Sequence, residues 1–338
     1  MKKHKNIPIF IPHMGCPNNC VFCNQKVISG TQKFDINSVP SLVYEALSTI
    51  DQNKYEVQLA YFGGSFTGID RADMLYLLSF GKKLIDEGKI SSVRCSTRPD
   101  YIDDDILKLL DEYGVKSIEL GIQSTNDDVL IASGRGHTHN DTVKACKLIK
   151  EYRKFELVGQ MMTSLPGSSW DKDIKTAEDI CKLGCDSARI YPTMTFKNTE
   201  LENMMKRGIY CPPTLEETVS NVWKILDIFI KNNINVIRIG LAEGDGLHGL
   251  EGIISDNYSP AMGELIIGEY YKNLICNLID SANRSEKLTI YAHKGHTSKI
   301  IGNKGCNKIY IADKYNIKYI KVVEKDDILL YNCKIEFN

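Results

Sequence analysis

The chain has 338 residues, a formal net charge of −1 and 43% hydrophobic residues, enough apolar material for one large domain or two smaller ones. No apolar run reaches the roughly 20 residues of a transmembrane helix, so we expect no membrane span. The eleven cysteines lack a disulfide-type spacing, and no secretory signal precedes them. We therefore expect a reducing, cytoplasmic compartment.

Short apolar segments alternate with amphipathic ones over the first two thirds of the chain. The strands we expect are 7–11, 57–62, 92–96, 117–121, 157–163 and 187–191, and the helices are near 38–52, 71–87, 103–113, 141–152 and 172–183. This alternation predicts an α/β fold with a parallel sheet, and six units fit a partial (β/α)6 TIM barrel. A helix around Leu226 and a strand at 236–239 are candidates for a seventh unit.

The helix expected at 103–113 shows the pattern on which these assignments rest. Ile106, Leu109, Leu110 and Tyr113 fall at the spacing i, i+3, i+4, i+7, which predicts a single apolar face. Three aspartates at its start favour the positive end of the helix dipole, and a glycine at 114 ends it.

Three cysteines follow the first expected strand with the spacing C-x3-C-x2-C, at Cys16, Cys20 and Cys23. Three thiolates on one loop can hold three corners of a [4Fe-4S] cluster and leave the fourth iron open. A structural zinc site is the alternative, but it needs a fourth ligand, for which only His13 is near. The C-x3-C spacing also differs from the usual C-x2-C zinc knuckle.

The triad, with Phe22 directly before its last cysteine, resembles the signature of the radical S-adenosylmethionine (radical SAM) enzymes. The resemblance implies that the open iron chelates the methionine part of SAM, and that one-electron reduction yields a 5′-deoxyadenosyl radical. In these enzymes the turn after the second strand receives the methionine amino group. Here that turn is Gly63, Gly64 and Ser65; a tight strand-to-helix connection is the alternative.

Further motifs in order along the chain resemble the radical SAM domain of the Elongator catalytic subunit family, which modifies wobble uridines of transfer RNA. They are STRPDY at 96–101, ELGIQS at 119–124, RGHT at 135–138, SLPG at 164–167, RIYPT at 189–193, TEL at 199–201 and GIY at 208–210. The family carries a large acetyltransferase domain after the radical domain, whereas fewer than 100 residues follow Ile239. We therefore expect a short bacterial form without acetyl transfer.

The resemblance also assigns cofactor-binding residues. Arg98 and Arg189 suit the carboxylate or ribose of SAM, because a guanidinium offers several planar donors, and Gln123 suits the ribose. Phe22 and Asn24, on either side of the last cysteine, are expected to contact the cofactor as well. Salt bridges at the barrel rim are the alternative for both arginines.

A glycine-containing loop after the fourth strand carries Arg135 and His137. Both are candidates to face the substrate, and His137 equally suits a helix cap. No catalytic residue can be named. A porphyrinogen-oxidase-like function would require a cysteine two residues after the triad, where Gln25 stands.

The segment 287–325 is basic, with nine lysines against Asp313 and Glu324. A GxxG sequence, 302–305, lies between two expected helices, with strands at 288–292 and 318–323 on either side. This order is typical of a KH-like clamp on an RNA backbone, in which Lys299, Lys304 and Lys308 would contact phosphates. A glycine turn on a lysine-covered surface is the alternative.

Together these features predict a radical SAM core at 1–240 and a small α+β C-terminal extension at 241–338. The expected cofactors are a [4Fe-4S] cluster and SAM, and the expected electron donor is a protein such as flavodoxin or ferredoxin. The substrate is not identified; transfer RNA and a small metabolite are both retained. The non-enzymatic alternative is an RNA-binding protein with a structural metal site.

Overall fold

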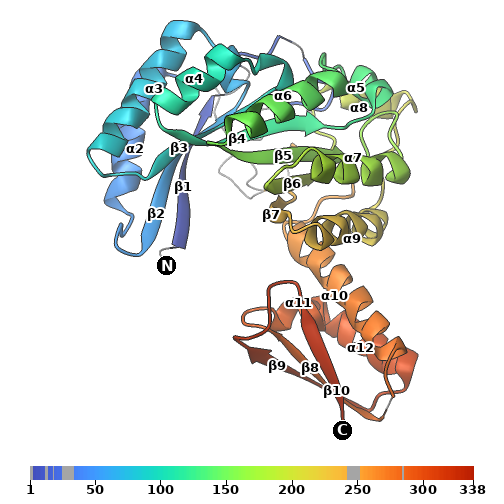
Figure 1. Ribbon diagram of the computed structural model, residues 1–338. Helices are drawn as coiled ribbons and strands as arrows, with labels where there is room; N and C mark the ends of the chain where they lie inside the picture. Colours follow the sequence, from blue (N-terminus) through green and yellow to red (C-terminus); the bar gives the residue numbers. More distant parts are fainter. Residues whose placement is uncertain (1–2, 12–13, 18, 25–33, 242–251, 284) are drawn as a thin grey trace.

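The computed structural model describes residues 3–11, 14–17, 19–24, 34–241, 252–283 and 285–338 (Figure 1). Seven parallel strands in the order β1 to β7 form one sheet, which curls into a half-barrel with helices on its outer side. The predicted partial barrel is therefore confirmed, and the candidate seventh unit is part of it. The strands are β1 (Lys3–Ile11), β2 (Tyr55–Gly63), β3 (Ser92–Thr97), β4 (Val115–Gln123), β5 (Glu156–Thr163), β6 (Ser187–Pro192) and β7 (Asn235–Ile239).

The helices of the core begin at polar caps that the sequence supplies. They are α2 (Val39–Ser48), α3 (Arg71–Asp86), α4 (Asp104–Glu112), α5 (Asp127–Ala132), α6 (His139–Tyr152), α7 (Trp170–Lys182), α8 (Glu200–Lys206) and α9 (Leu215–Lys231). Thr138 caps α6 in a reciprocal capping box with Asp141. His137 is therefore not the cap of this helix, and that alternative is wrong.

The core lies between the sheet and the helices. Parallel strands that are covered on both faces have nearly continuous apolar sequences. Strand β4 is an example of such burial, since only Lys116 of its nine residues is exposed. On α4, Leu107 and Leu110 are the buried residues. The other positions expected on the apolar face are only half-buried, so the face is turned slightly from the predicted one.

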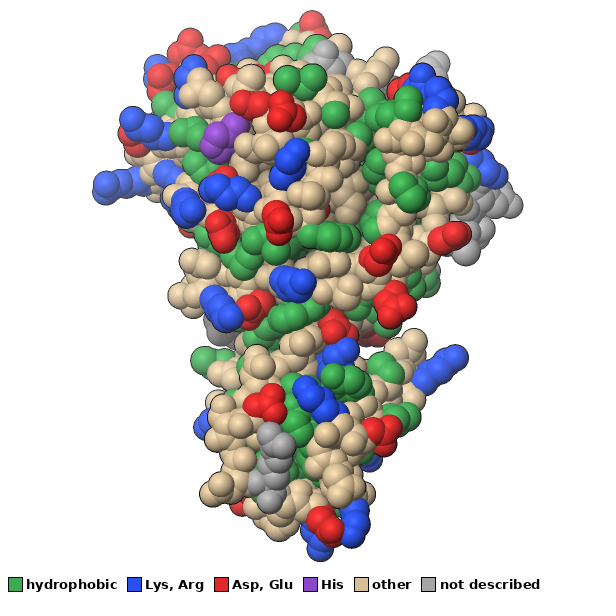
Figure 2. All heavy atoms as spheres, turned by 90° about the vertical axis from the view of Figure 1, so that its right-hand side faces the viewer, with side chains coloured by type: hydrophobic (Ala, Val, Ile, Leu, Met, Phe, Trp, Pro, Cys, Tyr) green, Lys and Arg blue, Asp and Glu red, His purple; other side chains and the backbone are tan. Residues whose placement is uncertain are grey.

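A long helix, α10 (Met262–Asp280), connects the barrel to a C-terminal module. The module contains β8 (Lys287–His293), α11 (Thr297–Ile301), α12 (Cys306–Tyr315), β9 (Tyr319–Lys325) and β10 (Cys333–Phe337). Its sheet has the order β10-β8-β9, with β8 and β9 parallel and β10 antiparallel to β8. The space-filling view shows a large lobe and a small one, with charges of both signs interspersed on this face (Figure 2).

Helix α10 packs against both parts. It contacts α9 and β7 of the barrel, and α11, α12 and β10 of the module. One continuous apolar cluster runs through these contacts, from Phe229 through Ile266 and Ile275 to Ile290. In the described part of the chain, no helix is both long enough and apolar enough to span a membrane.

A buried pair fixes α11 to α10 and makes the stability of the module depend on pH. The Tyr271 hydroxyl lies 2.7 Å from Nδ1 of His296. Burial lowers the pKa of His296 to about 4, and the charges of Lys299 and His293 act in the same direction. The folded chain therefore holds this ring neutral, whereas the unfolded chain protonates it below about pH 6.5.

We expect this contribution to be complete above pH 6.5 and to be lost as the pH falls from 6.5 towards 4. The difference in unfolding free energy between the wild type and His296→Gln should shrink by about 1 kcal/mol between pH 7 and pH 5, allowing for solvent screening. Denaturant unfolding at each pH measures this, with the exposed His4→Gln as the matched substitution. A His296→Gln difference that stays constant with pH would contradict it.

Candidate functional site

The loop that carries Cys16, Cys20 and Cys23, called the cysteine loop below, follows β1 at the carboxyl end of the sheet. Its backbone is in close contact with the turn that follows β2. The amide of Gly64 donates to the Ile11 carbonyl at 2.8 Å, and that of Ser65 donates to the Met14 carbonyl at 3.0 Å. A Cβ at Gly64 would lie 2.0 Å from the Met14 oxygen. Only glycine can occupy this position without moving the loop. The turn predicted to bind cofactor thus also positions the cysteines.

The other end of the loop is fixed to the far side of the half-barrel. The Val21 amide donates to the Ser133 carbonyl at 3.1 Å, and the Leu201 amide donates to the Val21 carbonyl at 2.8 Å. Phe22 is buried in a small apolar cluster with Val129, Leu165, Leu201 and Tyr210. Its ring therefore anchors the loop to the protein. Asn24 donates its side-chain amide to the Lys197 carbonyl at 3.1 Å.

Cys16, Cys20 and Cys23 are all half-buried, and none is in a disulfide. Three thiols on one loop, at the carboxyl end of the first strand, are a donor set that suits an iron–sulfur cluster. Among the residues that the structure describes, no three His, Cys, Asp or Glu side chains are grouped to hold a single metal ion. The candidate fourth zinc ligand, His13, lies outside the described residues.

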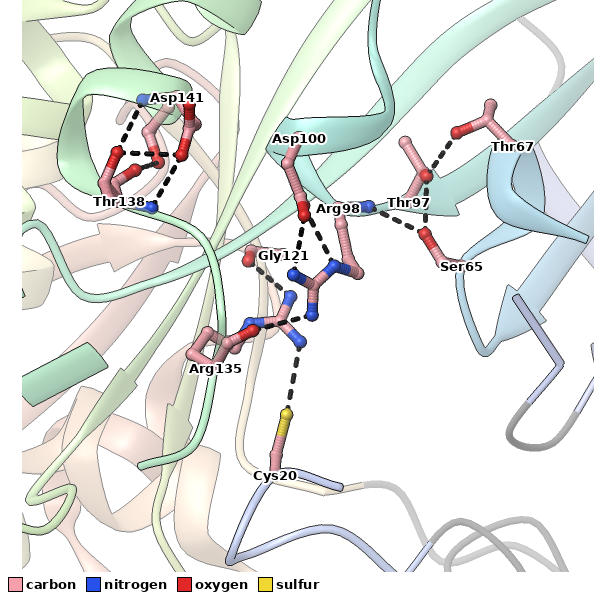
Figure 3. A network of polar contacts seen from close by, with 11 residues as sticks. Cys20, Ser65, Thr67, Thr97, Arg98, Asp100, Gly121, Arg135, Thr138 and Asp141 are labelled. Carbon is pink, nitrogen blue, oxygen red and sulfur yellow. Dashed lines mark hydrogen bonds and ion pairs between the residues drawn. The ribbon is translucent and has the colours of Figure 1, made fainter. Parts of the chain in front are cut away.

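A chain of two arginines connects the cysteine loop to the barrel (Figure 3). Arg135 donates from Nη1 to the Cys20 sulfur at 3.5 Å and from Nη2 to the Gly121 carbonyl at 2.7 Å. Arg98 donates from Nη1 to the Arg135 carbonyl at 2.7 Å and forms a bidentate pair with Asp100, at 2.9 and 2.7 Å. A guanidinium is thus held in place against one cysteine sulfur.

The arginines also act on the protonation of the loop. Burial raises the pKa of the Cys16 thiol, whereas the positive charges of Arg135 and Arg98 act to lower it. Metal ligation requires the thiolate. The two cations therefore offset part of the cost of forming thiolates in this partly buried loop.

Three buried hydroxyl groups connect the ends of β2 and β3 beside this network. The hydroxyl of Thr97 lies 2.9 Å from that of Ser65 and 2.6 Å from that of Thr67, which donates to the Tyr101 carbonyl at 2.9 Å. The Arg98 amide donates to the Ser65 hydroxyl at 3.2 Å. The Ser65 side chain therefore has a structural role that its place in a glycine-rich turn did not reveal.

Arg189 belongs to a second buried group further round the sheet. Its Nε lies 2.8 Å from Oε2 of Glu119, and its Nη1 donates to the Tyr191 hydroxyl at 3.2 Å. Burial raises the pKa of Glu119, and the charges of Arg189 and Arg94 oppose that rise. Both Arg98 and Arg189 thus form salt bridges, and their contact with a cofactor stays a prediction.

The other predicted site residues lie in two separate places: Gln123 and His137 belong to the barrel, and three lysines belong to the C-terminal module. Gln123 has a positive φ of 65° and accepts from the Gln160 amide at 3.4 Å, at the carboxyl end of β4. His137 is 3% exposed, and burial lowers its pKa to about 4, with Arg135 and Arg98 acting in the same direction. Lys299, Lys304 and Lys308 lie on or next to α11 and α12 of the C-terminal module, away from the barrel.

Sequence reasoning missed the groups that hold the site together. Asp100 stands two residues after Arg98, inside a motif that the sequence singled out, so their proximity was a usable signal. The contact of Arg135 with Cys20 joins residues 115 positions apart. No local pattern indicates such a pair.

Comparison with known proteins agrees with this architecture. Residues 10–180 match the radical SAM superfamily, and residues 185–272 match the radical SAM C-terminal domain. The tRNA uridine(34) acetyltransferase of Methanocaldococcus jannaschii is 28% identical over 198 residues, which is 52% of this chain and 36% of the relative. Elongator complex protein 3 of Schizosaccharomyces pombe is 28% identical over 171 residues, covering 50% and 31%. The chain thus spans about a third of the length of these curated relatives.

The solved structure of archaeal Methanocaldococcus infernus Elp3, lacking residues 1–46, superposes with a TM-score of 0.64. The superposition covers 82% of this chain and 64% of that one at 21% identity, which establishes the shared fold. The half-barrel, the cysteine loop and the family match all point to the same group. The chain belongs to the radical SAM superfamily of enzymes, whose members bind a [4Fe-4S] cluster and SAM, and its homologues are of the Elp3 and tRNA uridine(34) acetyltransferase kind.

Proposed function

We propose that Cys16, Cys20 and Cys23 hold the [4Fe-4S] cluster of this chain and that SAM binds between the open iron and the turn at Gly63, Gly64 and Ser65. When bound there, the cluster would supply the one-electron reduction that radical SAM chemistry requires, and the three cysteines would hold it. The observation that carries the proposal is the backbone contact between the cysteine loop and this turn. This contact supports the proposal because it joins the loop that carries the cysteines to the turn proposed to bind methionine.

The protein's own contribution is to bind and orient. Arg135 presents a fixed cation to the sulfur of Cys20, where it favours negative charge on a bound cluster. Gln123, at the end of β4, has a side-chain amide that suits a ribose hydroxyl. Arg98 and Arg189 act through their ion pairs, holding Arg135 and the β4 edge in place. Radical SAM enzymes require a reductant, and we expect reduced flavodoxin or ferredoxin to be the donor here.

We further propose that the substrate is a nucleoside in transfer RNA. Two observations support this: the curated relatives are named for tRNA uridine(34) and for Elongator, and segment 287–325 of the C-terminal module has nine lysines against Asp313 and Glu324. The proposal is limited to radical chemistry, because the family matches, at residues 10–180 and 185–272, are both radical SAM models.

The cluster assignment predicts the loss of SAM cleavage when one thiol is removed. Anaerobically reconstituted protein with SAM and reductant should form 5′-deoxyadenosine, and Cys20→Ala should reduce its formation to background, because the cluster would lose one of its three protein ligands. Liquid chromatography of the quenched reaction measures this. The exposed Cys211→Ala is the matched control and should keep its activity; equal activity of Cys20→Ala would contradict the assignment.

Arg135 should tune the cluster through its contact with Cys20. Replacing it by Gln removes a positive charge and a donor to sulfur, which makes the reduced cluster less stable. We expect a lower midpoint potential in an EPR-monitored titration, and 5′-deoxyadenosine formation lowered about tenfold. Arg135→Lys should recover part of the potential, and the exposed Arg207→Gln should change neither quantity. An unchanged potential in Arg135→Gln would show that the contact is only structural.

The substrate class is tested in cells that lack the gene. Mass spectrometry of nucleosides from purified transfer RNA should show one modified nucleoside missing, which the wild type restores and Cys20→Ala does not. Unchanged nucleosides together with an altered small metabolite would overturn the transfer-RNA proposal and favour the metabolite alternative. Because this readout is separate from 5′-deoxyadenosine formation, the chemistry and the substrate can fail independently.

A further inference from the structure

We infer that the C-terminal module is a KH-like clamp, in which the loop Gly302–Gly305 between α11 and α12 grips the backbone of single-stranded RNA. This is a second binding site, separate from the cysteine loop. It stands whether or not the barrel acts on transfer RNA. The inference rests on the topology of the module, the shape of the loop and the placement of its charges.

The topology is that of a strand–helix–GxxG–helix–strand unit. Strand β8 leads into α11, the loop connects α11 to α12, and α12 leads into β9, which pairs parallel with β8 in full register. In KH domains a GxxG loop between two helices holds about four nucleotides by their backbone. The third strand, β10, closes the other edge of β8.

The loop is a closed turn that exposes its two central side chains. The Gly305 amide donates to the Gly302 carbonyl at 3.0 Å, and Asn303 and Lys304 are exposed. Gly302, Lys304 and Gly305 all have positive φ, at 79°, 52° and 80°. A Cβ at Gly302 would lie 2.7 Å from the Cys306 sulfur. Glycine at 302 is therefore required by packing against α12, whereas a Cβ at Gly305 would meet no atom within 4 Å and glycine there is favoured by the positive φ.

A buried asparagine holds this loop to the long helix. Asn307 is 4% exposed, and its side-chain amide donates to the Gly268 carbonyl of α10 at 2.8 Å. The same amide lies 3.4 Å from the Lys299 carbonyl of α11. The loop is therefore fixed before any ligand binds, which reduces the entropic cost of gripping one.

Three lysines surround the loop with their charges unpaired by any described carboxylate. Lys299 precedes it on α11, Lys304 stands within it and Lys308 follows on α12. The module's other lysines include ion-paired ones, such as Lys318 with Glu286 at 2.6 Å and Lys294 with Asp326 at 4.0 Å. The loop also leads into the amino end of α12, where the Cys306 amide donates to the Asn303 carbonyl and no side chain caps the helix, so the helix dipole adds to the attraction for phosphate.

An apolar side chain next to the lysines gives the site a surface for a base. Ile309 is 58% exposed, and it lies one helical turn after Gly305, on the same side of α12 as the end of the loop. A strand gripped at the loop can thus lay a base against Ile309 while its phosphates face the lysines. A duplex cannot, because its bases are paired and stacked.

The exposed face of the module's sheet, opposite the helices, is the other surface that could bind RNA. A lysine on this face provides the control variant. Lys334 on β10 alternates with the buried Cys333, so it lies on the face away from the helices. Lys304→Asn and Lys334→Asn therefore make the same charge change on opposite sides of one module. Asparagine also tolerates the left-handed backbone at Lys304 better than most residues, so the loop should keep its shape.

The test measures binding of a fluorescein-labelled 12-nucleotide oligouridine RNA to the full-length reconstituted protein by anisotropy. We expect the Kd of Lys304→Asn to rise about fivefold, with that of Lys334→Asn unchanged. A plot of log affinity against log salt should have a slope of about −2 for three phosphate contacts, and a slope about 0.7 smaller in Lys304→Asn.

Three results would overturn the inference: no binding by the wild type, an equal loss in both variants, or a greater loss in Lys334→Asn. Tighter binding of a hairpin duplex than of oligouridine would do so as well. Formation of 5′-deoxyadenosine by the wild-type protein, assayed without RNA, is measured as a separate readout. A failure of the RNA clamp is thereby distinguished from a failure of the proposed radical chemistry.

Discussion

The close backbone contact between the cysteine loop and the turn after β2 is the constraint on which the site depends. The Ser65 amide donates to the Met14 carbonyl, and there is room for this only because position 64 has no side chain. A loop that carries three candidate metal ligands would otherwise be free to move. Here it is held at its start by the β2 turn and at its end by Leu201 and the buried Phe22.

The hydrogen bonds of Arg98 and Arg135 fix charged side chains at the site, just as the backbone contacts fix the loop. Arg135 contacts Cys20 because two hydrogen bonds fix it: Arg98 donates to its carbonyl, and its Nη2 donates to the Gly121 carbonyl. Arg98 in turn donates to the Asp100 carboxylate. Salt bridges of this kind cost free energy to desolvate, so they are weak grounds for stability. Their value lies in orientation, because the hydrogen bonds of Arg98 and Arg135 hold a cation beside a cysteine sulfur.

The sequence predicted the parts of the structure that follow from local patterns. The seven core strands, the long helices and the cysteine triad all have short-range signals, and all are present. Two kinds of feature had none. The short helices α5 and α8 hold only six and seven residues, too few to show a helical period. The roles of Arg98 and Arg189 depend on partners brought near by the sheet, and Glu119 lies 70 positions from Arg189. Arginine in a motif suits a ligand and a salt bridge equally until the fold is known.

Helix α10 holds the barrel and the C-terminal module at a fixed distance from each other. Helix α10 has 19 residues and therefore a length of about 28 Å, and it shares one apolar cluster with both the barrel and the module. Such a connection does not behave as a flexible linker, whose reach would vary with its conformation. An RNA strand held at the GxxG loop is consequently held at a distance from the cysteine loop that the protein sets. On the two proposals above, a substrate that engages both sites would have to span that distance, which a folded RNA can do and a single nucleoside cannot.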